Sequence, residues 1–174
     1  RFPLSALERE SKKGIYPYYG ASGIIDYVDE YLLDEETILI AEDGANLLSR
    51  STPLAFIAKG KYWVNNHAHV LQGRNGISTE HLMLALKGVN IQPFITGAVQ
   101  AKLSQSNMWR IQFLMPTQSV ASAFADLISP MFAKIRANSE QAQTLANLRD
   151  TLLPRLISGQ LRLPEAEAMV EGAS

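Results

Sequence analysis

The residues best suited to chemistry lie close together in the run Asn65-Asn66-His67-Ala68-His69. Two imidazole side chains two residues apart on a strand can bind one metal ion, so His67 and His69 suggest a metal-dependent enzyme. Its further ligands would come from His81, Glu42 or Asp43. The usual motif of this kind has a carboxylate a few residues after the second histidine, whereas residues 70–76 contain none. A metal site is therefore poorly supported, and we expect neither a metal nor any other cofactor.

The same run allows a second interpretation, in which its side chains recognise nucleic acid. On a strand, Asn65, His67 and His69 would share one face, because side chains alternate between the two faces. Asparagine can pair with adenine in the major groove, and histidine can donate to guanine or phosphate. A third interpretation is a structural polar cluster that hydrogen-bonds a neighbouring loop. Tyr18 and Tyr19 raise a similar choice between stacking on bases and packing in a core, and packing is favoured.

Other kinds of catalytic motif are absent from the sequence. There is no cysteine, which excludes disulfides, thiolate zinc sites and cysteine nucleophiles. The serine in Gly20-Ala21-Ser22-Gly23 lacks the spacing of a hydrolase nucleophile elbow. Neither a phosphate-binding glycine loop ending in Lys-Ser/Thr nor a methyltransferase-like glycine motif is present. We therefore expect a non-catalytic protein.

No segment of the sequence predicts a membrane span or a secretion signal. The apolar runs fall short of the ~18 residues that suggest a membrane-spanning helix. Residues 1–5 lack the apolar stretch of a signal peptide. The sequence does not begin with Met, which suggests a fragment or a processed piece. We expect a cytoplasmic location.

The charges are distributed unevenly, although the formal net charge is only −1. Residues 26–43 contain eight carboxylates and no lysine or arginine. Residues 50–110 contain seven cations and one carboxylate, Glu80, which gives a net charge of +6. A local positive field can attract a phosphate backbone even when the whole chain is nearly neutral. Ordinary solvated surface charge is the alternative and, on charge alone, the favoured explanation.

The elements that would position these residues change in type at Pro116. Before it, runs rich in β-branched and aromatic residues predict short strands at residues 37–41, 54–58 and 62–64. Residues 79–87 predict a short helix that Ser78 or Thr79 caps. These patterns predict a compact, strand-rich α+β domain over residues 1–115.

A long helix is predicted after Thr117, whose hydroxyl is suited to capping the first turn. No glycine occurs between Pro116 and Gly159, and apolar residues recur at steps of three or four. Such a narrow stripe is typical of the pairing surface of a coiled coil. This stripe, which we call the seam, comprises Phe124, Ile128, Met131, Ile135, Asn138, Ala142, Leu145, Leu148, Leu152 and Leu156.

The length of this helix implies a partner helix. About 35 residues at ~1.5 Å each span roughly 50 Å, too long for the seam to be buried against one small domain. Asn138 is the kind of polar seam residue that fixes register. Pro130 is expected to kink the helix or divide it in two, and Pro154 and Gly159 to end it. Residues 164–174 are expected to form a frayed tail.

Three stretches of the sequence are recognisable beyond these general patterns. They are residues 16–27 (YPYYGASGIIDY), residues 40–47 (IAEDGANL) leading to residues 65–70 (NNHAHV), and residues 145–159 (LANLRDTLLPRLISG). Together, and in this order, they closely resemble the specificity subunits of type I restriction-modification enzymes. The resemblance covers nearly the whole chain.

The resemblance implies a target recognition domain over residues 1–115, which reads one half of a bipartite DNA site. It implies a conserved spacer and dimerisation helix over residues 116–158 and a C-terminal tail over residues 159–174. In a complete subunit of this family, two recognition domains and two helices alternate, and the helices pack antiparallel. This chain has one of each and resembles the C-terminal half. Two copies paired through the seam would read a palindromic split site.

The resemblance also implies the partners of the chain. These are double-stranded DNA, methyltransferase (modification) subunits docked through the helices and, indirectly, the restriction and translocase subunit. The holoenzyme would be a type I site-specific deoxyribonuclease and adenine DNA methyltransferase, with this chain as its non-catalytic specificity subunit. The alternatives are a coiled-coil scaffold that does not bind DNA and the metal-dependent enzyme that uses His67 and His69. The positive segment argues mildly against a scaffold.

Residues that read bases must vary with the DNA target, so motifs shared across the family are poor places to look for them. For this reason we favour the structural interpretation for Asn66 and His67. Residues 48–52 and 97–107 lie outside the motifs and contain no carboxylate, and their polar side chains are of the types that contact phosphates. The predicted DNA-binding residues are Asn46, Ser49, Arg50, Ser51, Lys59, Lys61, Arg74, Gln100, Lys102, Ser104 and Gln105.

Overall fold

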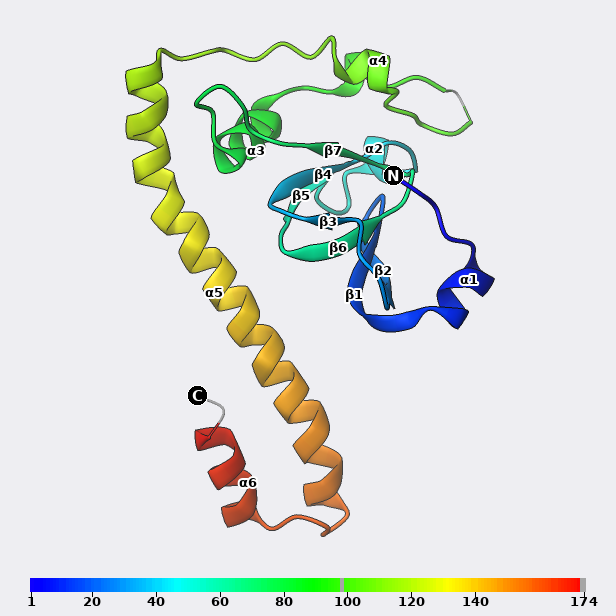
Figure 1. Ribbon diagram of the computed structural model, residues 1–174, viewed down its shortest axis with the longest axis vertical. Helices are drawn as coiled ribbons and strands as arrows, with labels where there is room; N and C mark the ends of the chain where they lie inside the picture. Colours follow the sequence, from blue (N-terminus) through cyan, green and yellow to red (C-terminus); the bar gives the residue numbers. More distant parts are fainter. Residues whose placement is uncertain (98, 173–174) are drawn as a thin grey trace. The chain divides into compact units, whose positions relative to one another are not determined.

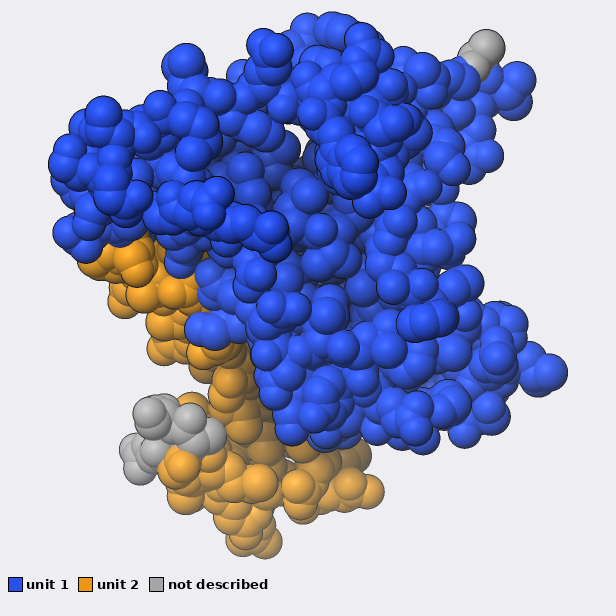
Figure 2. Space-filling model, turned by 45° about the horizontal axis from the view of Figure 1, so that its top comes forward, with its two compact units in different colours: residues 1–128 blue, residues 129–174 orange. Residues whose placement is uncertain are grey.

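The computed structural model describes residues 1–97 and 99–172 (Figure 1). The chain falls into two compact units, Arg1–Ile128 and Ser129–Ser174, which Figure 2 shows in different colours. The first unit contains the strands, four short helices and the beginning of a long helix. The second unit contains the rest of that helix and one short helix after it. A strand-rich domain followed by a long helix confirms the predicted α+β class.

Seven strands form two sheets in the described part of the first unit. The four-stranded sheet has the order β2-β1-β6-β3, with β1 and β6 parallel and the other neighbours antiparallel. The three-stranded sheet has the order β5-β4-β7 and is antiparallel throughout. The strands are β1 (Lys13–Gly20), β2 (Gly23–Val28), β3 (Leu33–Asp34), β4 (Thr37–Ala41), β5 (Ala55–Ala58), β6 (Lys61–Val64) and β7 (Ala68–Leu71). The three predicted strands are confirmed as β4, β5 and β6 to within one residue.

Short helices precede, interrupt and follow the strands of the first unit. They are α1 (Ala6–Ser11), α2 (Asn46–Ser49), α3 (Thr79–Gly88), the 3-10 turn η1 (Gln92–Phe94) and α4 (Gln105–Met108). α3 confirms the helix predicted at residues 79–87. Its N-cap is Ser78, whose hydroxyl accepts the backbone N–H of His81 at 3.1 Å. This bond satisfies one of the donors that the first turn of a helix leaves unpaired.

β4 is the middle strand of the three-stranded sheet, and all five of its residues are buried. Ile38 and Ile40 belong to an apolar cluster that includes side chains of α3. Leu39 belongs to a second cluster, which includes side chains of β6. The side chains of β4 therefore alternate between two cores. Because a strand buried on both faces is apolar throughout, its run of residues is recognisable in the sequence.

The tyrosine-rich motif of β1 forms part of the core. Tyr18 is fully buried, and its hydroxyl accepts the backbone N–H of Leu4 at 2.8 Å. The ring of Tyr19 packs against those of Phe56 and Tyr62, with centroid separations of 5.4 and 5.5 Å. The favoured interpretation of the two tyrosines as packing residues is confirmed.

The connection between β6 and β7 corrects the expectation of one alternating strand over residues 65–69. The two strands end and begin on either side of a turn. In this turn the side-chain oxygen of Asn65 accepts the backbone N–H of His67 at 2.8 Å. A bond from a side chain to the backbone two residues later favours a turn over strand pairing. Asn65, His67 and His69 therefore do not lie on one strand: Asn65 and His69 are buried and His67 is exposed.

The long helix is α5 (Gln118–Ile157), which runs for 40 residues without a break. Thr117 directly precedes it, and its carbonyl accepts the N–H of Ala121 at 2.9 Å. Its hydroxyl lies 3.2 Å from the hydroxyl of Ser119, so the predicted cap by the hydroxyl stays a prediction. The expectation that Pro130 divides the helix is wrong. Proline removes one intrahelical hydrogen bond, and the bonds of the turns on either side maintain the helical path.

The end of α5 differs from the expectation that Pro154 ends it. The helix continues past Pro154 to Ile157. Gly159 follows with a φ of 73°, a left-handed conformation that glycine adopts without strain. The N–H of Gly159 donates to the carbonyl of Leu156 at 3.1 Å and so satisfies one of the last carbonyls of the helix.

The expectation of a frayed tail over residues 164–174 is also wrong for the described part of that segment. Leu163–Glu171 form a helix, α6, while residues 173–174 lie outside the described residues. The carboxylate of Glu165 accepts the backbone N–H of Arg162 at 3.0 Å, which caps the start of α6. The predicted domain limits at 115 and 158 stay predictions.

Apolar packing holds α6 in the second unit. Leu161 and Ala166 form a buried cluster with Leu152 of α5, and Leu156 packs against it. Nine helical residues are too few to be stable alone in water, so burial of this kind is what keeps α6 folded. This packing is hard to foresee from local patterns, because it joins residues on either side of a glycine turn.

The two-sided burial of β4 can be tested with Leu39→Ala. Leu39 is fully buried, and loss of its side chain removes apolar packing and leaves a cavity. We expect the free energy of unfolding to fall by about 2–5 kcal/mol, measured by chemical denaturation. Leu48→Ala is the matched control, because Leu48 is exposed and its loss should change stability by about 0.5 kcal/mol or less. Equal destabilisation by the two changes would contradict the core position of β4.

Candidate nucleic-acid interface

The predicted DNA-binding residues lie at the two ends of β4. Antiparallel pairing places the end of β4 beside the starts of β5 and β7, because Ile40 pairs with Ala55 and Ala41 with Ala68. Residues between β4 and β5 therefore lie at one end, namely Asn46, Ser49, Arg50 and Ser51. Residues beyond the far ends of β5 and β7 lie at the other, namely Lys59, Lys61 and Arg74.

Backbone hydrogen bonds attach part of the polar stretch 97–107 to the C-terminal end of β4, the end followed by α2. The N–H of Gly44 donates to the carbonyl of Ala101 at 3.2 Å, and the N–H of Leu103 donates to the carbonyl of Glu42 at 2.7 Å. The structure thereby brings Gln100, Lys102, Ser104 and Gln105 to the end of β4 that also carries α2. Ala98, which belongs to the same predicted stretch, lies outside the described residues.

Asn46 organises the loop after α2 through its side-chain amide. The amide oxygen accepts the Thr52 N–H at 3.0 Å and the Ser51 hydroxyl at 3.2 Å. The amide nitrogen donates to the carbonyl of Thr52 at 3.1 Å. A side chain whose donor and acceptor are both used within the loop has little capacity left for a base. The geometry favours a positioning role for Asn46.

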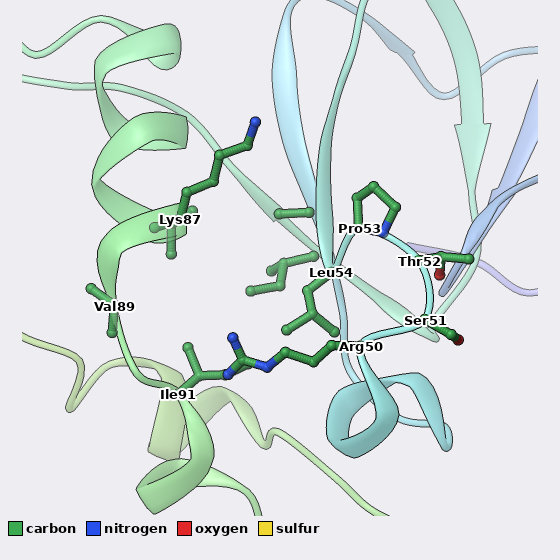
Figure 3. A pocket seen from close by; sticks show the side chains of 11 residues that line it. Arg50, Ser51, Thr52, Pro53, Leu54, Lys87, Val89 and Ile91 are labelled. Atoms are coloured by element: carbon green, nitrogen blue, oxygen red, sulfur yellow. The ribbon is translucent and has the colours of Figure 1, made fainter.

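Arg50 follows α2 in the left-handed conformation, with a φ of 50°. Residues other than glycine are uncommon in this region, and such positions cluster at functional sites. The backbone N–H of Arg50 donates to the carbonyl of Asn46 at 3.0 Å, which closes the turn. Figure 3 shows the Arg50 side chain extended across a pocket toward Ile91. Within the described residues, no carboxylate pairs with its guanidinium.

Glu42, directly after β4, lies close to nitrogen atoms of three other side chains. Its carboxylate accepts a hydrogen bond from Arg1 at 2.7 Å and lies 3.3 Å from the Lys102 ammonium and 3.6 Å from Nδ1 of His69. Burial raises the pKa of Glu42, but hydrogen bonds from Arg1 and Lys102 and the field of His69 outweigh it and leave the pKa below its ordinary value. Because Lys102 already faces a carboxylate, only part of its charge is available to a phosphate.

The contacts of the histidine motif support its structural interpretation. Nδ1 of His67 lies 2.8 Å from a carboxylate oxygen of Asp43, and Nε2 of His69 lies 2.7 Å from the carbonyl of Leu103. Since a carbonyl only accepts, Nε2 of His69 is the donor. Asn66 is exposed in the adjoining turn. Over residues 1–97 and 99–172, no three His, Asp or Glu side chains are grouped so that they could hold a metal ion.

The cations at the other end of β4 have different surroundings. The Lys59 ammonium lies 3.9 Å from the carboxylate of Glu36, and the Lys61 ammonium lies 4.8 Å from the ring centre of Tyr31. Arg74 is exposed in the turn after β7. Five strand residues at ~3.4 Å each separate these cations from the α2 loop by about 17 Å. The structure therefore does not bring the predicted residues together into one site.

A pocket of about 410 Å³ lies between the loop after α2 and the C-terminal end of α3 (Figure 3). Apolar side chains that include Leu54, Val89 and Ile91 line it, and Arg50 and Lys87 stand at its edges. Lys87 contributed to the positive charge of residues 50–110 but was not predicted to bind DNA. Packing of α3 on β4 and β5 places Lys87 beside the pocket. In the sequence, only the positive charge of Lys87 in the last turn of α3 hinted at a role in binding.

Comparison with known proteins identifies the family. The model for the type I restriction modification DNA specificity domain matches residues 2–147. A protein of Haemophilus influenzae named as a type I restriction enzyme specificity subunit is 37% identical over 134 residues, which cover 76% of this chain and 34% of the relative. The type I restriction enzyme MjaIX specificity subunit of Methanocaldococcus jannaschii is 26% identical over 137 residues, which cover 77% and 31%. The chain spans about a third of the length of these relatives.

The fold agrees with this relationship. The crystal structure of the type I restriction-modification system S subunit from M. genitalium superposes with a TM-score of 0.65, over 90% of this chain and 42% of that one. The identity of 15% makes this a likeness of fold alone. The chain belongs to the family of type I restriction modification DNA specificity domains. The predicted resemblance is thus confirmed. Among the described residues, no helix is both long and apolar enough to cross a bilayer.

The network around Glu42 can be tested by its dependence on pH. A carboxyl group whose pKa is lower in the folded protein stabilises the fold above its unfolded-state pKa and loses this effect as pH falls through the folded-state pKa. We expect wild type to be more stable than Glu42→Gln at pH 7, and the difference in unfolding free energy to shrink below the ordinary pKa of 4.5. Glu10→Gln, at a well-exposed ion pair, should show little difference. A wild-type advantage that is constant from pH 7 to pH 2.5 would contradict this role of Glu42.

Proposed function

We propose that this chain recognises one half of a bipartite double-stranded DNA target as the non-catalytic part of a type I restriction-modification specificity subunit. The observation that carries the proposal is the family match over residues 2–147, which spans both the strand-rich unit and most of α5. The relatives named above are specificity subunits, and their chains are longer. In such a subunit the second half-site would be read by another recognition domain or by a second copy of this chain.

The recognition face lies at the end of β4 that carries α2. We define it by Ser49, Arg50, Ser51, Lys87, Gln100, Lys102, Ser104 and Gln105. Three of these side chains are cationic, and two of those, Arg50 and Lys87, have no carboxylate partner among the described residues. Unpaired cations beside hydroxyl and amide groups suit phosphate and base-edge contacts. Lys59, Lys61 and Arg74 lie at the other end of β4 and are left out of the face.

The seam of α5 supports a helical partner. Met131, Ile135 and Leu145 are 54–58% exposed although they are large and apolar. Leu145 also lines an apolar groove of about 550 Å³, whose walls include Leu148 of α5 and Leu163 of α6. We propose antiparallel pairing with the helix of a second recognition half or a second copy of this chain. Through these helices the subunit would dock the methyltransferase subunits and, indirectly, the restriction and translocase subunit.

Selection from a random duplex-DNA pool tests the recognition role. The chain, together with its modification subunits, should enrich a split motif of defined spacing, and a palindromic motif would indicate two copies. Affinity should fall steeply with salt because phosphate contacts release bound counterions. An unenriched pool from a complex that sedimentation shows to be folded would contradict DNA recognition and favour a scaffold.

Substitutions on the recognition face should weaken DNA binding in a predictable way. Arg50→Ala and Lys102→Ala should each lower the affinity for many DNA sequences. Each should also reduce the slope of the logarithm of the binding constant against the logarithm of salt concentration, by about 1 for every phosphate that the variant no longer neutralises. The decrease should be smaller for Lys102, which Glu42 already pairs. Lys59→Ala, at the far end of β4, is the matched control and should bind as wild type does. Fluorescence anisotropy with the selected duplex measures all three, and unchanged binding by Arg50→Ala would contradict the face.

Pairing through the seam should respond to a charge placed in it. Ile135→Asp should weaken association of the chain by at least about tenfold, because a carboxylate between paired helices loses its hydration without a partner. Ala133→Asp places the same charge off the seam and should leave association unchanged. Sedimentation equilibrium over a concentration series gives both values. Equal effects of the two substitutions, or a wild type that does not associate at any concentration with itself or its partners, would contradict pairing through the seam.

A further inference from the structure

We propose that the pocket beside Arg50 accepts a single nucleotide of the target that has left the duplex stack. This inference rests on the proposed function, since it assigns one part of the recognition face to one unit of the DNA. It concerns a site within this chain and adds a requirement that contacts to an intact duplex do not have, namely that one base pair opens on binding.

The composition of the pocket fits a nucleotide rather than a simple anion. Leu54 and Ile91 point into the hollow from opposite walls (Figure 3), and Val89 adds to its apolar lining. Such walls suit the flat face of a base, whereas a phosphate alone gains nothing from them. Ser51 and Thr52 add hydroxyl groups at the loop side. The volume of about 410 Å³ falls in the range of roughly 300–1,000 Å³ found for small-molecule sites.

The charges of the pocket fit the backbone on either side of one nucleotide. Figure 3 shows the nitrogen atoms of Arg50 and Lys87 on opposite sides of the hollow. Each nucleotide within a strand is flanked by two phosphates, so one cation can face each of them. No Asp or Glu is among the lining residues in the described part of the chain, so nothing there repels a phosphate. The two cations are also free of carboxylate partners among those residues.

The pocket is formed before any ligand binds. Asn46 holds Thr52 by hydrogen bonds in both directions, at 3.0 and 3.1 Å. Arg50 is fixed in a left-handed turn that directs its side chain across the opening. Ile40 and Leu86, which also line the pocket, belong to the buried core. A rigid site loses little conformational entropy on binding, which helps to offset the unstacking of a base.

A mismatch scan of the selected duplex tests this inference. A base pair that must open on binding opens more readily when it is mismatched, so a mismatch there strengthens binding. We expect one position, on one strand, at which a mismatch tightens binding of the complex by roughly fivefold or more. Mismatches elsewhere should weaken binding or leave it unchanged. Fluorescence anisotropy at fixed salt gives the ratio of mismatched to matched affinity at each position.

Variants of the chain show whether the tightening arises in this pocket. Leu54→Trp fills the pocket with an indole and should return the affinity ratio to about one. Leu48→Trp is the matched control, because Leu48 is exposed on α2 and does not line the pocket, and it should keep the tightening. Lys87→Gln changes an exposed side chain without disturbing the core and should reduce the tightening even if Leu54→Trp is unstable.

The outcomes separate this inference from the proposed function. A complex that binds the selected duplex but is not tightened by any mismatch overturns the pocket and leaves DNA recognition standing. Tightening that persists in both Leu54→Trp and Lys87→Gln places the opened nucleotide elsewhere, in a partner subunit or at another surface, and also overturns it. Failure to enrich any duplex overturns the proposed function and this inference together.

Discussion

The carboxylate of Glu42 holds three separate parts of the first unit together at the end of β4. It binds Arg1 from the start of the chain, faces Lys102 from the segment before α4, and lies beside His69 of β7. Burial of a carboxylate is unfavourable alone, and here the hydrogen bonds and charges of its neighbours more than compensate, since the net effect on the pKa of Glu42 is a decrease. With this group in place, the chain leaving β4 and residues 101–103 pair through their backbones. The loop that contains α2 and the polar stretch 97–107 are therefore both held at the C-terminal end of β4.

The network around Glu42 explains why the family motifs and the proposed DNA-contacting residues are different sets of residues. His67 reaches Asp43 and His69 reaches Leu103, so the motif after β6 connects parts of the framework. Arg50 and Ser51 belong to a loop whose shape Asn46 fixes from one side while its other face stays exposed. A framework fixed by polar contacts can carry loops of different composition, which is how rigid scaffolds present variable binding residues.

The features that could be predicted from the sequence are those that depend on neighbouring residues. β4 is apolar throughout because both its faces are buried, and Ser78 caps α3 three residues before the N–H that it accepts. The features that were missed depend on distant contacts. Lys102 is paired by a carboxylate 60 residues away in sequence, and α6 is stable because it packs back on α5. The predicted cations lie at two opposite ends of β4 because of the strand register, and the register cannot be inferred from composition.

The packing of α6 also bears on how much of the seam is open to a partner helix. The 40 residues of α5 would extend about 60 Å, about 1.7 times the 34–36 Å between half-sites one DNA turn apart. Leu152 is buried by α6, however, whereas Met131, Ile135 and Leu145 are exposed. A partner that pairs without displacing α6 has only the exposed part, roughly 21 Å from Met131 to Leu145 at ~1.5 Å per residue. In the pairing proposed above, the C-terminal helix would limit the overlap of the two helices, and through that overlap the distance between two recognition domains.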